Sequence, residues 1–387
     1  MADIMEYKCP ACGGAMEFDS KTQKMKCPYC DTEMDVETFQ KMQDEKAAKE
    51  TAGSPEEGAA EGMTGAAGME GAASEESDTS DWEAAGSGQW QQGEADGMRV
   101  YLCKSCGGEI VAEETTAATT CPFCGNRVVM QGQFSGERKP DYIIPFKLDK
   151  KAAKEAYHRH LKGKYFMPSI FKQENHIEEI RGIYVPFWIF DAETHASATF
   201  SGELCRVWKE GDMEYTEHEN YEMRRSGDLS FSHIPTDGSK KMDDALMESL
   251  EPFDFSEAVP FQTAYLAGYT AERYDMDVES CIGRAKARIR TSAVNTLSDT
   301  VEGFQAVRMM RSSVSVSRAT YLYVLYPVWI LNTKWKGKKY IFAMNGQTGK
   351  MVGNLPFDKN EFWKYVATRG AGIGVAIYAF LWAITSL

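Results

Sequence analysis

The chain has 387 residues, of which 43% are hydrophobic and 26% charged, and its formal net charge is −14. This length allows two or three domains of ordinary size, and the composition excludes a fully disordered chain, a collagen and a multi-span membrane protein. The net charge alone suggests an acidic protein that nucleic acid would repel.

Eight of the ten cysteines form two matched sets, each made of two Cys-x-x-Cys pairs. Within a set, 14 residues separate the two pairs, and adding 94 to a position in the first set gives its counterpart in the second. A whole module is therefore repeated. The first set is Cys9, Cys12, Cys27 and Cys30, and the second is Cys103, Cys106, Cys121 and Cys124.

The spacing of each set is that of a zinc ribbon. Two Cys-x-x-Cys turns joined by a short hairpin can place four thiolates about 2.3 Å from one Zn²⁺ ion. Disulfides are disfavoured because no apolar signal sequence precedes Cys9. Thioredoxin-like redox pairs need a strand-to-helix setting, and rubredoxin-type iron is the stronger alternative because it uses the same S₄ shell. We predict two structural Zn²⁺ sites, in small β ribbons at residues 1–40 and 98–135.

An acidic segment rich in Gly, Ala and Ser separates the ribbons, at residues 41–97. From Thr51 to Gly97 it contains eleven acidic residues and no Lys or Arg, so it accounts for −11 of the net charge. Such a composition predicts a disordered, self-repelling linker. Trp82 and Trp90 are the residues within it that suggest contact with a folded part.

Residues 140–357 have the composition of an α+β domain. Asp149 is placed to cap a helix that ends near Leu161. The apolar run at 182–190 is typical of a buried strand, and so is the run at 321–331.

An internal duplication is predicted in this domain, because residues 186–191 align with residues 327–332 at a shift of 141. The half-repeats lie near 140–203 and 277–352, each a helix followed by a strand pair; coincidence in a β-rich composition is the alternative. The second half begins with a predicted helix at 277–297 and ends with a hairpin whose turn is at 345–349.

No catalytic motif occurs in the chain: it has no nucleophile elbow, zinc-protease helix motif, phosphate loop or dinucleotide fingerprint. Cys205 and Cys281 stand apart from the ribbons and are interpreted as small buried residues. We therefore expect a protein without enzymatic activity and without a small-molecule substrate.

The C-terminal residues 370–387 form an 18-residue stretch without a charged side chain. As a helix it would be about 27 Å long, close to the thickness of a bilayer core of about 30 Å. Lys359, Lys364 and Arg369 precede it, which predicts a single-pass membrane anchor with the bulk of the protein in the cytoplasm. A helix packed on the domain is the alternative.

Taken together, the four cysteine pairs, the run Tyr184–Phe190 and the hydrophobic end resemble a family of bacterial double zinc-ribbon proteins (TFIIB-type zinc ribbon) that associate with membranes. Members of that family are found beside SPFH-domain (flotillin-like) and phage-shock-type stress proteins, and are often labelled primosomal helicase-like. The helicase label implies a motor, and the chain has no Walker motif that would support one. The resemblance implies SPFH or phage-shock-type protein partners.

The sequence thus predicts a multidomain, membrane-anchored adaptor that recruits cytoplasmic proteins through its zinc ribbons, in an envelope stress response. The alternative is a zinc-ribbon protein that binds nucleic acid in transcription or replication. Nucleic-acid binding is less favoured because neither ribbon has a clear excess of basic residues, and each Zn(Cys)₄ centre adds a charge of about −2.

Overall fold

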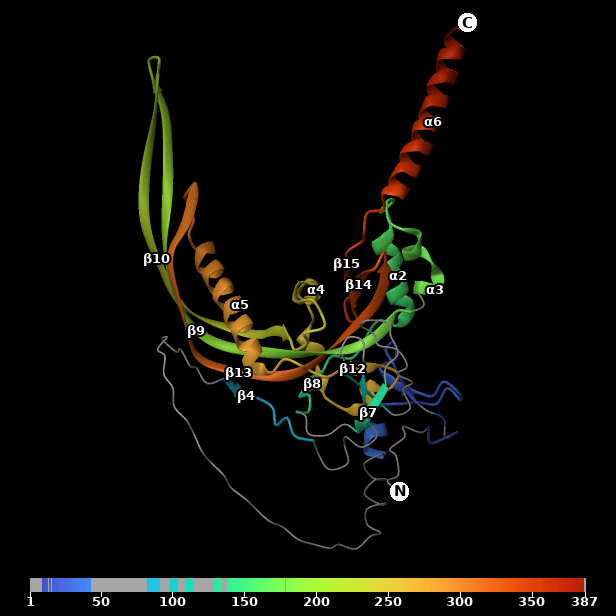
Figure 1. Ribbon diagram of the computed structural model, residues 1–387. Helices are drawn as coiled ribbons and strands as arrows, with labels where there is room; N and C mark the ends of the chain where they lie inside the picture. Colours follow the sequence, from blue (N-terminus) through green and yellow to red (C-terminus); the bar gives the residue numbers. More distant parts are fainter. Residues whose placement is uncertain are drawn as a thin grey trace.

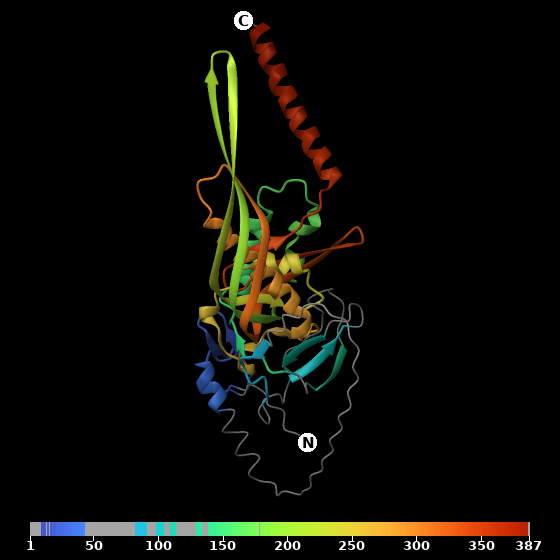
Figure 2. The ribbon, with the colours of Figure 1, turned by 90° about the vertical axis from the view of Figure 1, so that its left-hand side faces the viewer.

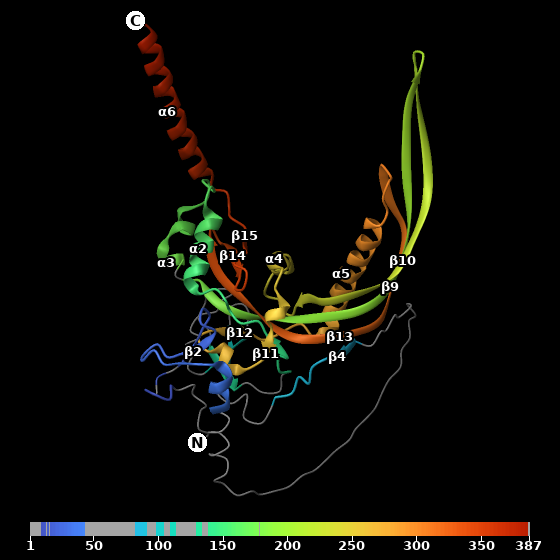
Figure 3. The same cartoon turned by 180° about the vertical axis from the view of Figure 1, so that it is seen from behind.

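The computed structural model describes residues 9–12, 14, 16–42, 82–90, 98–103, 109–113, 129–133, 138–177 and 179–385. Two antiparallel strands of 30 residues each, β9 (Arg181–Glu210) and β13 (Ala306–Trp335), form the centre of a strongly curved sheet. In Figure 1 the sheet rises on one side into the hairpin of β9 and β10 (Met213–Asp237), and α6 (Lys359–Thr385) projects on the other side. The view from behind shows the same U-shaped outline (Figure 3).

In the described part of the chain the sheet has twelve strands, and five of the other ten pair directly with β9 or β13. The order is β11-β8-β13-β9-β12-β6-β5-β7, with β10 added to β9, and β4 and the β14–β15 hairpin added to β13. The bounds are β4 Trp82–Ala84, β5 Met98–Leu102, β6 Glu109–Glu113, β7 Val129–Gln133, β8 Tyr142–Ile143, β11 Val259–Pro260, β12 Thr270–Glu272, β14 Lys338–Asn345 and β15 Met351–Gly353.

Helices cover parts of both halves of the sheet. The longer ones are α2 (Lys150–Leu161), which begins at its cap Asp149, and α5 (Val278–Asp299), and both match predicted helices. Figures 1 and 3 show α4 and α5 on the concave side of the sheet. The short helices are η1 Ser169–Lys172, α3 Glu174–Ile177, α4 Asp244–Leu250, η2 Phe255–Glu257 and η3 Thr263–Leu266.

The burial of β9 follows its sequence pattern. Residues 183–190 form a continuous apolar run and are all buried, as expected for a strand covered on both faces. From Ala192 to Phe200 burial alternates, because one face packs against Ala293 and Leu297 of α5 while the other is partly open.

The two halves of the domain share the order helix, long strand, hairpin. The first half contains α2, β9 and β10, and the second contains α5, β13 and β14. Val185 pairs with Tyr326, and these two positions differ by 141, the shift between the predicted half-repeats. Each helix packs on the strands of the other half: α5 lies on β9, and Tyr157 of α2 contacts Phe342 of β14 with ring centroids 5.2 Å apart.

The prediction of ribbons separate from the main domain is wrong. β6 of the second ribbon segment pairs with β12, so β5, β6 and β7 extend the large sheet. The first ribbon has its own sheet of β1 (Glu17–Asp19), β2 (Lys24–Lys26) and β3 (Glu33–Met34), and it packs on η3. Figure 2 shows these two groups of strands on opposite sides of the body. The second ribbon is joined to the main domain by strand pairing, and the first by a shared apolar surface. The spacing of the cysteines alone could not show either connection.

Part of the predicted linker is also joined to the body. β4 pairs in parallel with Ala319–Tyr321 of β13, and Trp82 contacts Phe190 edge to face at 5.0 Å. Trp90 contacts Phe261 in the same way at 5.9 Å. Within 41–97 the structure describes residues 41–42 and 82–90, and the other residues of this segment lie outside the described part.

The predicted C-terminal anchor, and the membrane localisation inferred from it, are wrong: no helix in the described part of the chain is long and apolar enough to span a membrane. The first eleven residues of α6 include Lys359, Glu361, Lys364 and Arg369. The uncharged stretch that follows is at the lower length limit for a span, and its first five residues include three glycines.

Candidate metal centre

Four cysteines of the first ribbon lie at the ends of its hairpin. Cys9 and Cys12 precede β1, while Cys27 follows β2 and Cys30 comes before β3. Because Glu17 pairs with Lys26 in the β1–β2 hairpin, the two Cys-x-x-Cys turns are brought to the same end of the sheet.

Backbone hydrogen bonds close both turns. The amide of Cys9 donates to the carbonyl of Gly14 at 2.7 Å, and the amide of Cys27 donates to the carbonyl of Thr32 at 2.9 Å. Asp31 follows Cys30 with a positive φ of 56°, a conformation that Asp tolerates better than most residues. Each Cys-x-x-Cys pair therefore forms a tight turn, and the sulfur atoms of one turn face those of the other.

The sulfur positions suit a single metal ion. The Sγ atoms of Cys9 and Cys30 are 3.5 Å apart, those of Cys12 and Cys27 are 3.4 Å apart, and all four lie within 4.8 Å of one another. A tetrahedron with 2.3 Å bonds to sulfur has edges of about 3.8 Å, whereas a disulfide needs about 2.05 Å. The four thiols are therefore not paired as disulfides and could hold a metal ion.

The electrostatics of the turns favour thiolate at Cys9. Burial raises the pKa of the Cys9 thiol. The backbone N–H groups of Cys12 and Ala11 and the neighbouring side chains have a larger opposite effect, so the pKa is lowered to about 6. Hydrogen bonds from the side chain and backbone of Thr32 likewise lower the pKa of Cys30. Backbone N–H groups directed at sulfur are what a thiolate metal ligand requires.

The first ribbon is fixed to the body of the protein at several points. The amide of Phe18 donates to the carbonyl of Ala267 at 3.2 Å, and its ring meets Tyr265 edge to face at 5.2 Å. Gln23 donates to the carbonyl of Phe146 at 2.8 Å. Lys21 forms an ion pair of 2.7 Å with Asp149, the residue that caps α2. The four cysteines are thus held in a defined position relative to the body.

The second set of cysteines is only partly described. Cys103 directly follows β5 and is buried in the same cluster as Ile110 of β6. Cys106, Cys121 and Cys124 lie outside the described residues. A metal site at this set stays a prediction.

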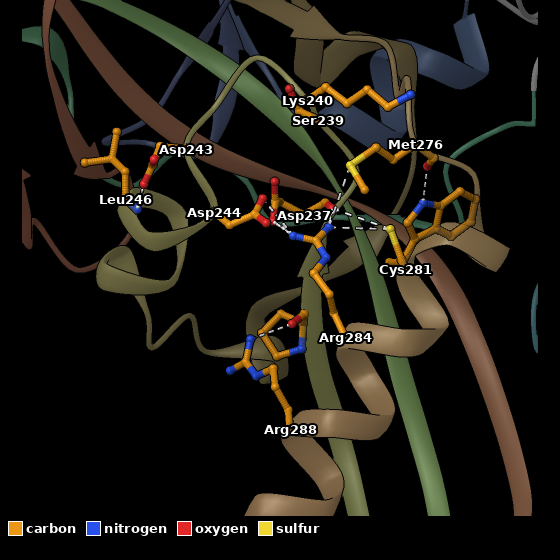
Figure 4. Close-up of polar contacts among 12 residues, drawn as sticks. Asp237, Ser239, Lys240, Asp243, Asp244, Leu246, Met276, Cys281, Arg284 and Arg288 are labelled. Carbon is orange, nitrogen blue, oxygen red and sulfur yellow. Dashed lines mark hydrogen bonds and ion pairs between the residues drawn. The ribbon is translucent and has the colours of Figure 1, made fainter.

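A cluster of charged side chains around the buried Asp237 lies where β10 meets α4 and α5 (Figure 4). Arg284 pairs with Asp237 at 2.9 Å and with Asp244 at 2.8 Å. Burial raises the pKa of Asp237 to about 6, although Arg284 opposes this rise. The adjoining cavity has a volume of about 10 Å³, room for at most one water molecule. These ion pairs therefore join the elements of the fold and offer no space for a substrate.

One group of metal-ligating side chains was missed by sequence reasoning. Cys205, interpreted as an isolated buried residue, lies half-exposed beside Glu203 and His218 on the β9–β10 hairpin, with their ligand atoms within 4.8 Å. Cys205 and His218 are almost equally distant from the turn at Gly211. A hairpin with its turn at Gly211 would have placed Cys205 and His218 opposite each other, and this could have been inferred from the sequence.

The chain is similar to a protein of Bacillus subtilis (strain 168) named Uncharacterized protein YdjG. The two are 32% identical over 374 residues, which cover 97% of this chain and 96% of the relative. No family model matches the chain. No solved structure matches it either.

Proposed function

The chain belongs to the same family as YdjG of Bacillus subtilis, and we propose that it is a non-enzymatic zinc-ribbon protein that acts by binding other proteins. The observation that carries this proposal is the convergence of Cys9, Cys12, Cys27 and Cys30 on one point at the surface of the domain. Four thiolates in a tetrahedral shell are typical of structural Zn²⁺, with iron as the other metal that accepts such a shell.

In this proposal the metal has a structural role. The strands β1, β2 and β3 have three, three and two residues, too few for a stable sheet without further support. A bound Zn²⁺ ion supplies that support, because the free energy of metal binding contributes directly to folding. The second cysteine set, with Cys103, Cys106, Cys121 and Cys124, is proposed to hold a second ion in the same way.

The charges of the first ribbon favour a protein partner over nucleic acid. Lys24 pairs with Asp35 at 3.5 Å, and Lys26 lies 3.5 Å from Asp31 and 3.4 Å from Glu33. These lysines are neutralised locally, whereas phosphate binding requires unneutralised basic side chains on one face. A Zn²⁺ ion with four thiolates would make this end of the ribbon more negative by about two charges.

Tyr29 gives the ribbon an aromatic contact residue. It lies between Cys27 and Cys30, its side chain packs beside Gly14, and it is 77% exposed. Tyr is among the residues that contribute most to protein–protein interfaces. We propose that partners bind around Tyr29, and that they belong to the SPFH or phage-shock-type proteins implied by the family resemblance.

The test compares Tyr29→Ala with Tyr165→Ala, which removes an exposed tyrosine from outside the ribbon. Full-length tagged proteins are purified from cells, and their zinc content and co-purifying proteins are measured. Tyr29→Ala should keep its zinc and bind its partner about 30-fold more weakly, the effect of an interface residue worth about 2 kcal/mol. Tyr165→Ala should resemble the wild type, and Cys9→Ser should lose one ion and the partner.

Two outcomes would overturn the proposal. One is a set of co-purifying proteins that does not differ between the wild type, Tyr29→Ala and Cys9→Ser. The other is co-purification of nucleic acid whose removal by nuclease releases every associated protein, which would favour the nucleic-acid alternative.

A further inference from the structure

A second group of metal-ligating side chains lies on the hairpin of β9 and β10, which Figure 1 shows projecting from the body. Cys205 of β9 is directly opposite His218 of β10 in the register. Glu203 is two residues before Cys205 and so lies on the same face of the strand. Three different ligand types, sulfur, nitrogen and oxygen, are therefore placed together by strand pairing alone.

The three ligand atoms converge on one point. His218 Nδ1 is 2.5 Å from Glu203 Oε1 and 3.2 Å from Cys205 Sγ, and Cys205 Sγ is 3.5 Å from Glu203 Oε1. A tetrahedral Zn²⁺ ion with bonds of about 2.0 to 2.3 Å would separate these atoms by about 3.4 to 3.6 Å. Two of the three separations are already within about 0.4 Å of these values, and the third opens by side-chain rotation when the ion replaces a hydrogen bond.

Packing does not explain the three side chains. Ala198 and Phe200 lie in the cluster that contacts α5, so by alternation Glu203 and Cys205 are on the opposite face of the sheet. The side chains of His218 and Glu203 are 54% and 37% exposed. A cysteine at such a position is unusual, because free cysteine is among the most buried residue types.

The geometry also differs from that of a nucleophilic cysteine. In a catalytic Cys–His arrangement, one ring nitrogen faces the thiol and a third group orients the ring through the other nitrogen. Here Nδ1 of His218 faces both the thiol of Cys205 and the carboxylate of Glu203. One nitrogen cannot both activate the thiol and bind the group that orients the ring. Metal ligands, in contrast, are arranged as these three atoms are, facing a common point.

The position of Cys205 in the backbone is held by Gln305. The amide of Cys205 donates to Oε1 of Gln305 at 3.1 Å, and Nε2 of Gln305 donates to the carbonyl of Cys205 at 3.0 Å. The β9–β13 ladder begins at Ala306. The two hydrogen bonds of the Gln305 side chain extend the pairing beyond it, to Cys205. This limits the freedom of the strand at the ligand residue.

We propose that Glu203, Cys205 and His218 bind a divalent transition-metal ion of the Zn²⁺ type, with its fourth position open to water or an external ligand. Mixed sulfur, nitrogen and oxygen donors suit Zn²⁺ and Co²⁺, whereas Ca²⁺ and Mg²⁺ require oxygen ligands. Three protein ligands with one open position distinguish this site from the closed Cys₄ shell of the ribbon.

The test adds Co²⁺ to the full-length protein after a short treatment with a chelator, which removes the ion from the open hairpin site before it removes zinc from a closed Cys₄ shell; a thiolate–Co²⁺ bond then gives a charge-transfer absorption. The closed ribbon sites keep their zinc, and the hairpin site is expected to bind one Co²⁺ ion per chain with that absorption. Cys205→Ser should abolish the absorption, and His218→Ala and Glu203→Gln should each weaken Co²⁺ binding at least about tenfold. The matched control is His195→Ala, which removes an exposed histidine paired with Asp228 on the same hairpin, and it should bind Co²⁺ as the wild type does.

Cys9→Ser separates this site from the ribbon, because it should lose one zinc ion and keep the Co²⁺ signal of the hairpin. The proposal is overturned if the wild type binds no Co²⁺ beyond the ions that exchange at the ribbons. It is equally overturned if Cys205→Ser shows the same thiolate absorption as the wild type.

Discussion

Glu272 gives the protein a pH-dependent stability that one substitution should remove. It is the last residue of β12, its side chain is fully buried, and its Oε1 accepts a hydrogen bond of 2.6 Å from Ser239. Lys241 lies 3.8 Å away but is itself paired with Asp275 at 2.7 Å. Burial raises the pKa of Glu272 from 4.5 to about 8, although Ser239 and Lys241 pull it down. Its Oε2 has no hydrogen-bond partner, which costs less for a neutral carboxyl than for a buried carboxylate.

The sign and size of the effect follow from linkage. Because the folded-state pKa is higher than the unfolded one, the folded protein holds a proton that the unfolded chain releases above about pH 4.5. The contribution is therefore fully present below pH 4.5 and is lost as the pH rises through about 8. At about 1.4 kcal/mol per pKa unit, the shift from 4.5 to about 8 corresponds to about 5 kcal/mol.

The assay is urea unfolding followed by tryptophan fluorescence, from pH 5 to pH 9, for the wild type, Glu272→Gln and the control Glu279→Gln, which changes an exposed glutamate of α5. The free energy of unfolding of the wild type should fall relative to Glu272→Gln by about 4 kcal/mol across this range, because part of the change occurs below pH 5. Glu279→Gln should follow the wild type. Parallel curves for the wild type and Glu272→Gln would refute the reasoning.

Three further substitutions test the packing. Phe146→Ala should lower the free energy of unfolding by about 4 kcal/mol in urea unfolding, since the buried ring stacks on Tyr269 at 4.3 Å; a loss below about 1 kcal/mol would contradict it. Gly346→Ala should cost about 1 to 3 kcal/mol in the same assay, because the new Cβ would lie 2.7 Å from Phe146 Cδ1, and an unchanged midpoint would count against this contact. Asp149→Ala should lower the free energy of unfolding by about 1 kcal/mol because α2 loses its N-terminal cap, whereas Asp149→Asn should retain most of the stability because Asn also caps helices. Equal losses in the two variants would show that the ion pair with Lys21, and not the cap, stabilises the protein.

Local signals in the sequence were enough to predict several elements. Asp149 caps α2 as expected, the apolar run at 183–190 is buried, and the turn at 345–349 joins β14 to β15. Each depends on residues close together in the chain. The full lengths of β9 and β10 could not be predicted, because their outer residues are polar and exposed and give no apolar pattern. These residues are held in the strands by backbone hydrogen bonds to the neighbouring strand.

The same distinction separates the two metal-ligand groups. The cysteine cluster of the first ribbon could be predicted because each pair of ligands is three residues apart and the spacing specifies the turn. The hairpin group depends on Cys205 facing His218 across two strands, and register is fixed only when the turn and the pairing are known. The attachment of the second ribbon strands to β12 likewise depends on pairing between distant segments.

The shift of 141 between the predicted half-repeats separates the outer part of the β9–β10 hairpin from the rest of the sheet. By the shift of 141, the last residue of β13, Trp335, corresponds to Thr194 in the middle of β9. The second hairpin turns there, since β14 has 8 residues, whereas β9 continues to Glu210 and β10 has 25 residues. The outer part of the β9–β10 hairpin therefore has no counterpart in the other hairpin, and the core does not require its exposed polar residues. The Glu203–Cys205–His218 group lies within this outer part of the hairpin, where packing of the core does not require these side chains, and the proposed metal-binding role accounts for them better than packing does.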